Sequence, residues 1–226
     1  MHRKDFAGHL KKGASFLSDH EQQFIKKYTP RVPSWLQTQH LTLLSLVWVG
    51  LIIYFSFLAK KNVSWMWIVS ICVFLQWISD VFDGAVGRYR GSGLVKWGYY
   101  MDHFMDYLFL CSVLIGYSFL VSDHNKYLLF FVLIIFSAFM VSSYLIFNVT
   151  NELEITYFKM GPTEMRIMII LINTAIIFLG INFVEKHVLI YVIFLPLAVL
   201  VASVYRRQRH IWQIDLEDKK NGSGRS

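Results

Sequence analysis

Four aspartates and one arginine lie close together where one apolar stretch ends and the next begins. Asp80 and Asp83 form the first pair, and Asp102 and Asp106 form the second. Successive residues of an α-helix turn by about 100°, so residues three or four positions apart share a face. Each pair should therefore present two carboxylates on one helix face, with Arg88 on the face of the first pair. An aspartate inside a membrane span costs about 2.5–3.5 kcal/mol, so four of them indicate a functional site.

The residue types around the aspartates indicate which chemistry this site would do. Carboxylate oxygens favour Mg²⁺, Mn²⁺ or Ca²⁺, and neither Cys nor His clusters here in the way that zinc would require. Two divalent ions bridged by carboxylates stabilise the charge on a phosphoryl group during displacement. Gly84, Gly87 and Gly98 let a ligand approach the backbone closely, and Arg88 can bind phosphate oxygens through two hydrogen bonds. The pattern predicts metal-dependent phosphoryl transfer.

The complete string of these residues resembles the signature of the CDP-alcohol phosphotransferases, integral membrane enzymes that make phospholipid head-group linkages. It reads Asp80-x2-Asp83-Gly84-x2-Gly87-Arg88, then nine residues, then Gly98-x3-Asp102-x3-Asp106. The family usually has Ala before the Arg, where this chain has Gly87. That change keeps the helix face open and lowers helix propensity.

The resemblance implies an activity and a role for each matching residue. A substituted phosphate would pass from a CDP-alcohol to an acceptor alcohol, with release of CMP. Two ions, Mg²⁺ or Mn²⁺, would be held by the four aspartates, Asp80, Asp83, Asp102 and Asp106. Asp106 would also take the proton from the attacking hydroxyl. The CDP-alcohol would be bound by Gly84, Gly87, Arg88 and Gly98. Members of the family often pair, which leaves a homodimer open.

The donor, the acceptor and two other classes of function stay open. Six spans are typical of the smaller members, which mostly use CDP-diacylglycerol in phospholipid biosynthesis. Transfer from CDP-choline or CDP-ethanolamine to a lipid alcohol is the alternative. The pair of Asp102 and His103 resembles the Asp-His pair of that branch of the family. A cation transporter could use the aspartates, although ion transport does not require Gly84, Gly87 and Arg88 on one face. A catalytically inactive scaffold is a third reading, and the intact aspartates argue against it.

A later arginine is a further candidate for binding a phosphate. Arg166 follows Pro162 near the start of the fifth expected span, on the side where the aspartates lie. Its guanidinium could meet an acceptor or lipid phosphate. Glu164, two residues earlier, fits the ordinary preference for acidic residues at a helix N-terminus.

The composition is that of a membrane protein. Of the 226 residues, 55% are apolar and 16% are charged, and mean hydropathy is +0.45. The net charge of +7 comes from basic residues that flank apolar spans, which favours anionic lipid over nucleic acid as the partner. Cys72 and Cys111 lie in apolar segments, and no disulfide is expected.

These patterns predict an all-α integral membrane protein with six transmembrane helices preceded by an interfacial amphipathic helix. Residues 1–40 would form the interfacial segment, residues 41–205 the catalytic domain and residues 206–226 a polar cytoplasmic tail. The amphipathic segment is suggested by the spacing of Phe6, Leu10, Leu17 and Phe24 beside lysines. The expected spans are 41–59, 63 to about 90, 95–121, 127–149, 162–184 and 188–205, the last with a kink at Pro196.

Six spans would place both termini, the turn between the aspartate pairs and the fourth-to-fifth connector on one side of the membrane. That side carries 18 of the 22 Lys and Arg residues, and the other side carries 4. The positive-inside rule assigns the richer side to the cytoplasm, together with the active site. The terminal residues 222–226, Gly-Ser-Gly-Arg-Ser, are given no function.

Overall fold

Long helices make up most of the chain in the computed structural model, which describes residues 10–12, 16–91, 94–150, 152–154 and 161–223. The α-helices in these ranges are α1 (Ser18–Tyr28), α2 (Thr38–Ala59), α3 (Met66–Arg90), α4 (Val95–Ser118), α5 (Lys126–Thr150), α6 (Pro162–Leu179), α7 (Ile181–His187) and α8 (Leu189–Ser223). Shorter elements are the 3₁₀ turns η1 (Thr29–Arg31) and η2 (Val63–Trp65) and the strands β1 (Leu10–Lys12) and β2 (Glu152–Glu154).

Five helical segments in the described ranges are long and apolar enough to cross a membrane. They are Thr38–Ala59, Val63–Arg90, Lys126–Thr150, Pro162–Leu179 and Ile181–Lys220. Helix α4 has 24 residues, a length of about 36 Å, and contacts both α2 and α5. It carries Lys96, Asp102 and Asp106 near its start, which lowers its apolar character. The expected all-α membrane protein is confirmed, with α4 as the sixth long helix.

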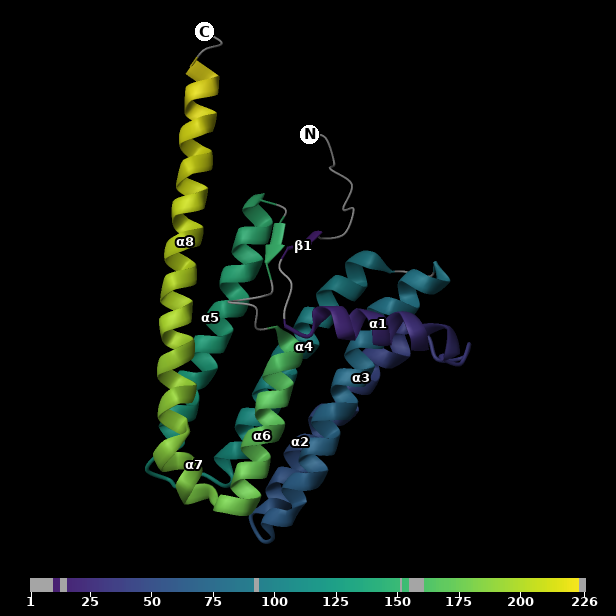
Figure 1. Cartoon of the computed structure of the whole chain (residues 1–226), viewed down its shortest axis with the longest axis vertical. Helices are drawn as coiled ribbons and strands as arrows, with labels where there is room; N and C mark the ends of the chain where they lie inside the picture. The colour runs from purple at the N-terminus through teal and green to yellow at the C-terminus, as the bar shows by residue number, and fades with distance from the viewer. Residues whose placement is uncertain (1–9, 13–15, 92–93, 151, 155–160, 224–226) are drawn as a thin grey trace.

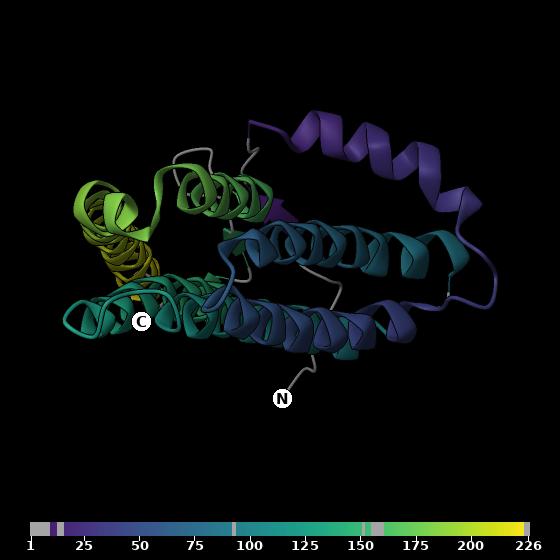
Figure 2. The same cartoon turned by 90° about the horizontal axis from the view of Figure 1, so that it is seen from below.

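The long helices run side by side, and α1 lies across them at one end (Figure 1). The turn between α3 and α4 and the far end of α8 lie at this same end (Figure 1). Seen from below, α2 and α3 are neighbours and α6 lies beside α3, while α5 and α8 occupy the other side (Figure 2). Contacts between α2 and α3, α2 and α4, α3 and α6, and α5 and α8 agree with this arrangement.

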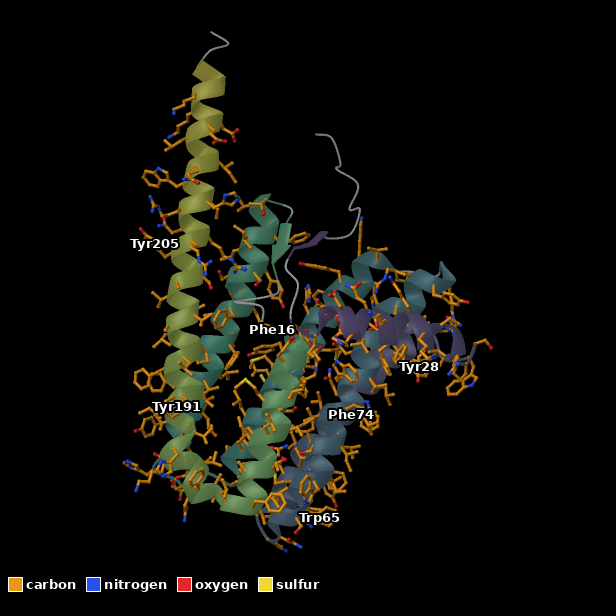
Figure 3. The ribbon with its side chains drawn as sticks, viewed as in Figure 1. Phe16, Tyr28, Trp65, Phe74, Tyr191 and Tyr205 are labelled. Atoms are coloured by element: carbon orange, nitrogen blue, oxygen red, sulfur yellow. The ribbon has the colours of Figure 1, made fainter. Side chains whose placement is uncertain are left out.

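Apolar side chains lie both inside the bundle and on its outer surface. Ile52, Val73 and Ile176 are buried in the core between α2, α3 and α6. On α8, by contrast, Tyr191 and Tyr205 are more than half exposed on the outer surface (Figure 3). A helix that is apolar all round requires an apolar surrounding, so the outward residues are expected to face lipid.

The last two expected spans have different ends from those predicted. The fifth was expected to reach residue 184, but α6 ends at Leu179 because Gly180 adopts a positive φ of 83°. The short α7 then turns the chain towards α8. The sixth span was placed at 188–205, but α8 continues through Pro196 to Ser223, so its polar end is helical too.

The N-terminal segment forms a shorter helix than its apolar spacing suggested. Phe24 of α1 packs against Trp77 and Phe82 of α3, with ring centroids 5.8 and 5.7 Å apart. Lys26 and Lys27 are exposed on the same helix. Phe6 lies outside the described residues, so its place in the amphipathic pattern stays a prediction.

Two short strands are an addition to the expected all-α fold. β1 and β2 pair in parallel, with Leu10 opposite Glu152 and Lys12 opposite Glu154. They come from polar segments that precede α1 and follow α5, where the backbone groups need hydrogen-bond partners outside a helix. This pairing joins the N-terminal segment to the connector before α6.

Candidate active site

The end of α3 and the start of α4 carry the predicted residues. Asp80 and Asp83 lie in the last three turns of α3, which Gly91 ends in a left-handed conformation with φ of 63°. Asp102 and Asp106 follow in the second and third turns of α4. Both carboxylate pairs are therefore placed at the end of the bundle where α1 lies across it.

Arg166 of α6 connects the two pairs. Its Nη2 donates to Asp80 Oδ2 and to Asp106 Oδ1, each at 3.0 Å. The side chain is buried, with 4% of its surface exposed, and its guanidinium carbon lies 5.2 Å from the centroid of the Phe109 ring. Carboxylates from two different helices thus meet on one permanent cation. The sequence analysis placed Arg166 on the side where the aspartates lie and did not predict these two ion pairs.

Gln76 is a site residue that the sequence did not single out. Arg166 Nε donates to Gln76 Oε1 at 2.7 Å, and Gln76 has no exposed surface. Its Nε2 has no hydrogen-bond partner among the described residues. Gln76 precedes Asp80 by one helical turn and lies in an apolar run. A polar amide at that position was the feature of the sequence that could have indicated a site residue.

Asp83 is held by the start of α2. The Thr42 hydroxyl donates to Asp83 Oδ2, and the Thr38 hydroxyl donates to the Asp83 carbonyl oxygen at 3.3 Å. The carboxylate is buried, because α2 covers it. Thr42 is therefore a second site residue that spacing within α3 could not reveal.

Asp102 lies beside its own neighbour. His103 Nδ1 is 3.5 Å from Asp102 Oδ2, and about a third of the Asp102 side chain is exposed. The His103 ring packs between Tyr99 and Tyr144, with centroids 4.4 and 5.1 Å away. The His103 ring therefore packs among aromatic side chains while its Nδ1 stays near Asp102.

The glycines of the motif have different surroundings. A Cβ at Gly84 would lie 3.1 Å from Arg88 Nη1, so the missing side chain leaves room for that guanidinium. At Gly98 a Cβ would meet nothing within 4 Å. Gly87 is buried in α3, whereas Arg88 is exposed at its end. A ligand could therefore approach through Gly84, Arg88 and Gly98.

The four aspartates are not gathered around one point. No three His, Cys, Asp or Glu side chains in the described ranges are grouped so that they could hold a metal ion. Asp80 and Asp106 converge on Arg166, whereas Asp83 is directed to Thr42. The donor chemistry fits a hard divalent cation, because the candidate ligands are carboxylate oxygens, and those of Asp80 and Asp106 come together from two helices.

Fold and site together define a multi-pass α-helical membrane protein with carboxylates and arginines at one end of its bundle. The chain matches the family model described as CDP-alcohol phosphatidyltransferase over residues 35–204, which is more than half of its 226 residues. The protein belongs to the CDP-alcohol phosphatidyltransferase family. It is therefore a transferase that moves a phosphate group from a CDP-alcohol to an alcohol acceptor. No individual curated protein matches the chain significantly.

Family membership decides between the classes of function that the sequence left open. The family consists of phosphotransferases, which favours catalysis over cation transport. Its members generally depend on a divalent metal. The matched range contains every residue of the predicted site, from Asp80 to Arg166.

Proposed function

We propose that this protein makes phospholipids by transferring a substituted phosphate from CDP-diacylglycerol to a polar acceptor alcohol, with release of CMP. The observation that carries the proposal is the convergence of Asp80 and Asp106, from two helices, on Arg166 at one end of an apolar bundle. A donor with acyl chains and a cytidine diphosphate needs a site where lipid meets water, and the end of the bundle is such a place. Six long helices agree with the smaller members of the family, which favours this donor over CDP-choline.

Two divalent ions, Mg²⁺ or Mn²⁺, would be held by oxygen atoms of Asp80, Asp83, Asp102 and Asp106. When bound, the metal would stabilise the negative charge on the phosphoryl group that is transferred. Asp80 and Asp106 fit this role because their carboxylates, from two helices, converge at the Arg166 guanidinium and so lie close to each other. Asp83 would have to exchange its hydrogen bond with Thr42 for the metal.

Asp106 is the proposed general base. The hydroxyl oxygen of the acceptor alcohol forms a bond to the phosphorus that carries the diacylglycerol oxygen of the donor. The bond between that phosphorus and the oxygen that bridges it to CMP breaks. The proton of the acceptor hydroxyl goes to the Asp106 carboxylate, and CMP leaves with the electron pair of the broken bond. Asp106 is suited to this step because it is partly exposed, at 28% of its side chain, and so can reach a bound alcohol.

The donor nucleotide would bind along the exposed edge of the motif. Arg88 can hold the diphosphate through its planar guanidinium, and Gly84 gives that guanidinium its space. Gly87 and Gly98 would keep the two helices free of side chains near the diphosphate. Arg166 is the proposed contact for an acceptor or lipid phosphate, since it is the buried cation beside the base.

The proposed orientation places the active site and both termini in the cytoplasm. In the expected six-span topology, the basic residues concentrate on the side that carries the site, and the positive-inside rule assigns that side to the cytoplasm. Activated nucleotides are made there, so the donor would reach the site without crossing the bilayer.

The proposal is tested by measuring CMP formation by the purified full-length protein in detergent micelles. CDP-diacylglycerol with glycerol phosphate, serine or inositol phosphate forms one set of assays, and CDP-choline or CDP-ethanolamine with diacylglycerol forms the other. We expect CMP only with CDP-diacylglycerol, and only when Mg²⁺ or Mn²⁺ is added back after chelation. CMP from CDP-choline alone would instead assign the protein to the other branch. CMP formation in the presence of excess chelator would contradict metal dependence.

A further inference from the structure

The buried pair of Gln76 and Arg166 is placed where it would affect cation binding. We propose that Arg166 competes with a divalent cation for Asp80 and Asp106, and that Gln76 is the positioning residue that directs Arg166 to them. This inference rests on the proposed function, since it concerns the same carboxylates. It adds a residue outside the motif and a role for Arg166 before any substrate binds.

Competition follows from the atoms that Arg166 contacts. One nitrogen, Nη2, lies 3.0 Å from Asp80 Oδ2 and 3.0 Å from Asp106 Oδ1. A guanidinium is always charged and has no lone pair, so Arg166 cannot itself bind the metal. A divalent cation that binds the same two carboxylates lies close to the Arg166 charge, so repulsion between the two cations opposes its binding, and it gains most where it takes the place of a hydrogen bond from Nη2.

Gln76 fixes the direction of the guanidinium. Its Oε1 accepts from Arg166 Nε at 2.7 Å, on the edge of the guanidinium group rather than at its tip. Because Nε can only donate, the amide oxygen must face Arg166, and the amide nitrogen must point elsewhere. That nitrogen is buried without a partner among the described residues, which is an unfavourable arrangement in an apolar bundle. The hydrogen bond with Arg166 is therefore the contact that explains a glutamine at this position.

A displaced Arg166 would keep a favourable environment. The Phe109 ring lies 5.2 Å from the guanidinium carbon and can hold the cation while the carboxylates bind metal. The bond to Gln76 does not involve the carboxylates, so it can persist as well. Arg166 would then have Nη2 available for a phosphate oxygen, which joins cation binding to the proposed phosphate contact.

The test is Mn²⁺ binding to the purified full-length protein, measured by electron paramagnetic resonance without any CDP-alcohol. Arg166→Gln removes the competing charge and should tighten Mn²⁺ binding by roughly tenfold. Gln76→Leu keeps the Arg166 charge but removes the hydrogen bond that positions it. Mn²⁺ affinity should therefore rise by a smaller factor, a few-fold. Arg207→Gln is the matched control, because Arg207 is also buried, bonds Ser142 at 2.9 Å and belongs to α8. Its Mn²⁺ affinity should equal that of the unmodified protein.

Opposite results would overturn the inference. If Arg166 and Gln76 only maintained the fold, both substitutions would weaken Mn²⁺ binding or leave it unchanged. Should Arg166→Gln fail to fold, Gln76→Leu decides alone, since leucine has a similar size and suits an apolar helix. An unmodified protein that neither binds Mn²⁺ nor forms CMP would defeat the proposed function itself. An unmodified protein that binds Mn²⁺, with no gain in either variant, would defeat only the competition.

Discussion

Two arginines at the end of α3 are two residues apart and have different surroundings. Arg90 donates to the carbonyl oxygens of Leu36 at 2.7 Å, Val32 at 2.8 Å and Pro33 at 2.9 Å. It therefore holds the segment that leads into α2. Arg88 is exposed and lies beside Gly84, where a nucleotide diphosphate could reach it. The same residue type serves structure at one position and, in our proposal, substrate binding at the other.

Arg88→Ala and Arg90→Ala should consequently fail in different ways. Removing Arg88 should raise the KM for the CDP-alcohol about tenfold to hundredfold, since a charge-assisted hydrogen bond contributes about 1.5–3 kcal/mol. The KM for the acceptor should change much less. Arg90→Ala should lower the thermal unfolding temperature, because three carbonyl oxygens lose their donor. Steady-state kinetics with each substrate varied in turn would check this, and a defect of Arg88→Ala confined to the acceptor would contradict the assignment.

Asp106 is the residue whose replacement should separate binding from turnover. Asp106→Asn keeps an oxygen that can accept from Arg166 Nη2 but removes the base, so kcat should fall about 10²–10⁴-fold. Binding of the CDP-alcohol should be largely preserved in a direct binding assay. Asp123→Asn is the control, because Asp123 is exposed in the loop before α5 and pairs with Lys126 at 2.6 Å. A fully active Asp106→Asn protein would rule out this base.

At the scale of the helices, the site depends on how α2 is packed. Helix α2 contacts both α3 and α4, and its first turns hold Asp83 through Thr42. At the other end of the bundle, Gly116 of α4 packs against Ser56 of α2. A Cβ at Gly116 would lie 2.5 Å from Ser56 Oγ and 2.9 Å from Ser56 Cβ. The close approach of these two helices therefore requires a glycine.

Gly116→Ala should destabilise the protein by about 1–3 kcal/mol, as expected for overpacking at a tight contact. The measurement is thermal unfolding in detergent. Gly50→Ala is a matched control on α2, because a Cβ there would meet nothing within 4 Å. That control should unfold at the same temperature or slightly higher. Adding Ser56→Gly to Gly116→Ala should restore stability, and a double variant no better than Gly116→Ala would show that the strain lies elsewhere.

Helix α1 joins two of the elements that carry the site. The Thr163 hydroxyl of α6 donates to Glu21 of α1 and accepts from Trp77 Nε1 of α3 at 3.2 Å. Glu164 Oε1 accepts from the backbone nitrogen of Leu17 at 3.0 Å. These bonds lie less than one turn before Arg166, so α1 helps to fix the start of the helix that carries this cation.

At the scale of the whole molecule, the expected topology puts loops and ends on opposite sides of the membrane. The α2–α3 turn and the α4–α5 loop lie at the end of the bundle away from α1, and α8 extends beyond the site end (Figure 1). The first group is therefore expected outside the cytoplasm and the end of α8 inside it. Only the distribution of Lys and Arg assigns these sides.

Single cysteines introduced into a protein lacking Cys72 and Cys111 would check the orientation. Asn62→Cys and Asp123→Cys should react with an impermeant maleimide in intact cells. Gln213→Cys, near the exposed end of α8, should react only after the membrane is permeabilised. Labelling of Gln213→Cys alone in intact cells would reverse the orientation. Labelling of all three from outside would contradict the five spans, an odd number, that are expected between the α2–α3 turn and the end of α8.

The sequence by itself determined the helical membrane class and the residues of the motif. Both follow from local order, because apolar runs set the spans and spacings of three and four place carboxylates on a helix face. The family resemblance is confirmed by the match over residues 35–204. Helix ends were less predictable: Gly180 ended α6 early, and α8 continued past Pro196. Those ends depend on backbone conformation that composition does not specify.

Only the tertiary structure decided which side chains meet. Arg166 is 86 positions from Asp80 and 60 from Asp106, and Gln76 is 90 positions from Arg166. Spacing within one helix says nothing about contacts at such separations, which depend on how α3, α4 and α6 pack. Thr42 reached Asp83 for the same reason. The sequence thus specified the chemical groups, and the packing of separate helices decided that a buried arginine lies between two of the carboxylates.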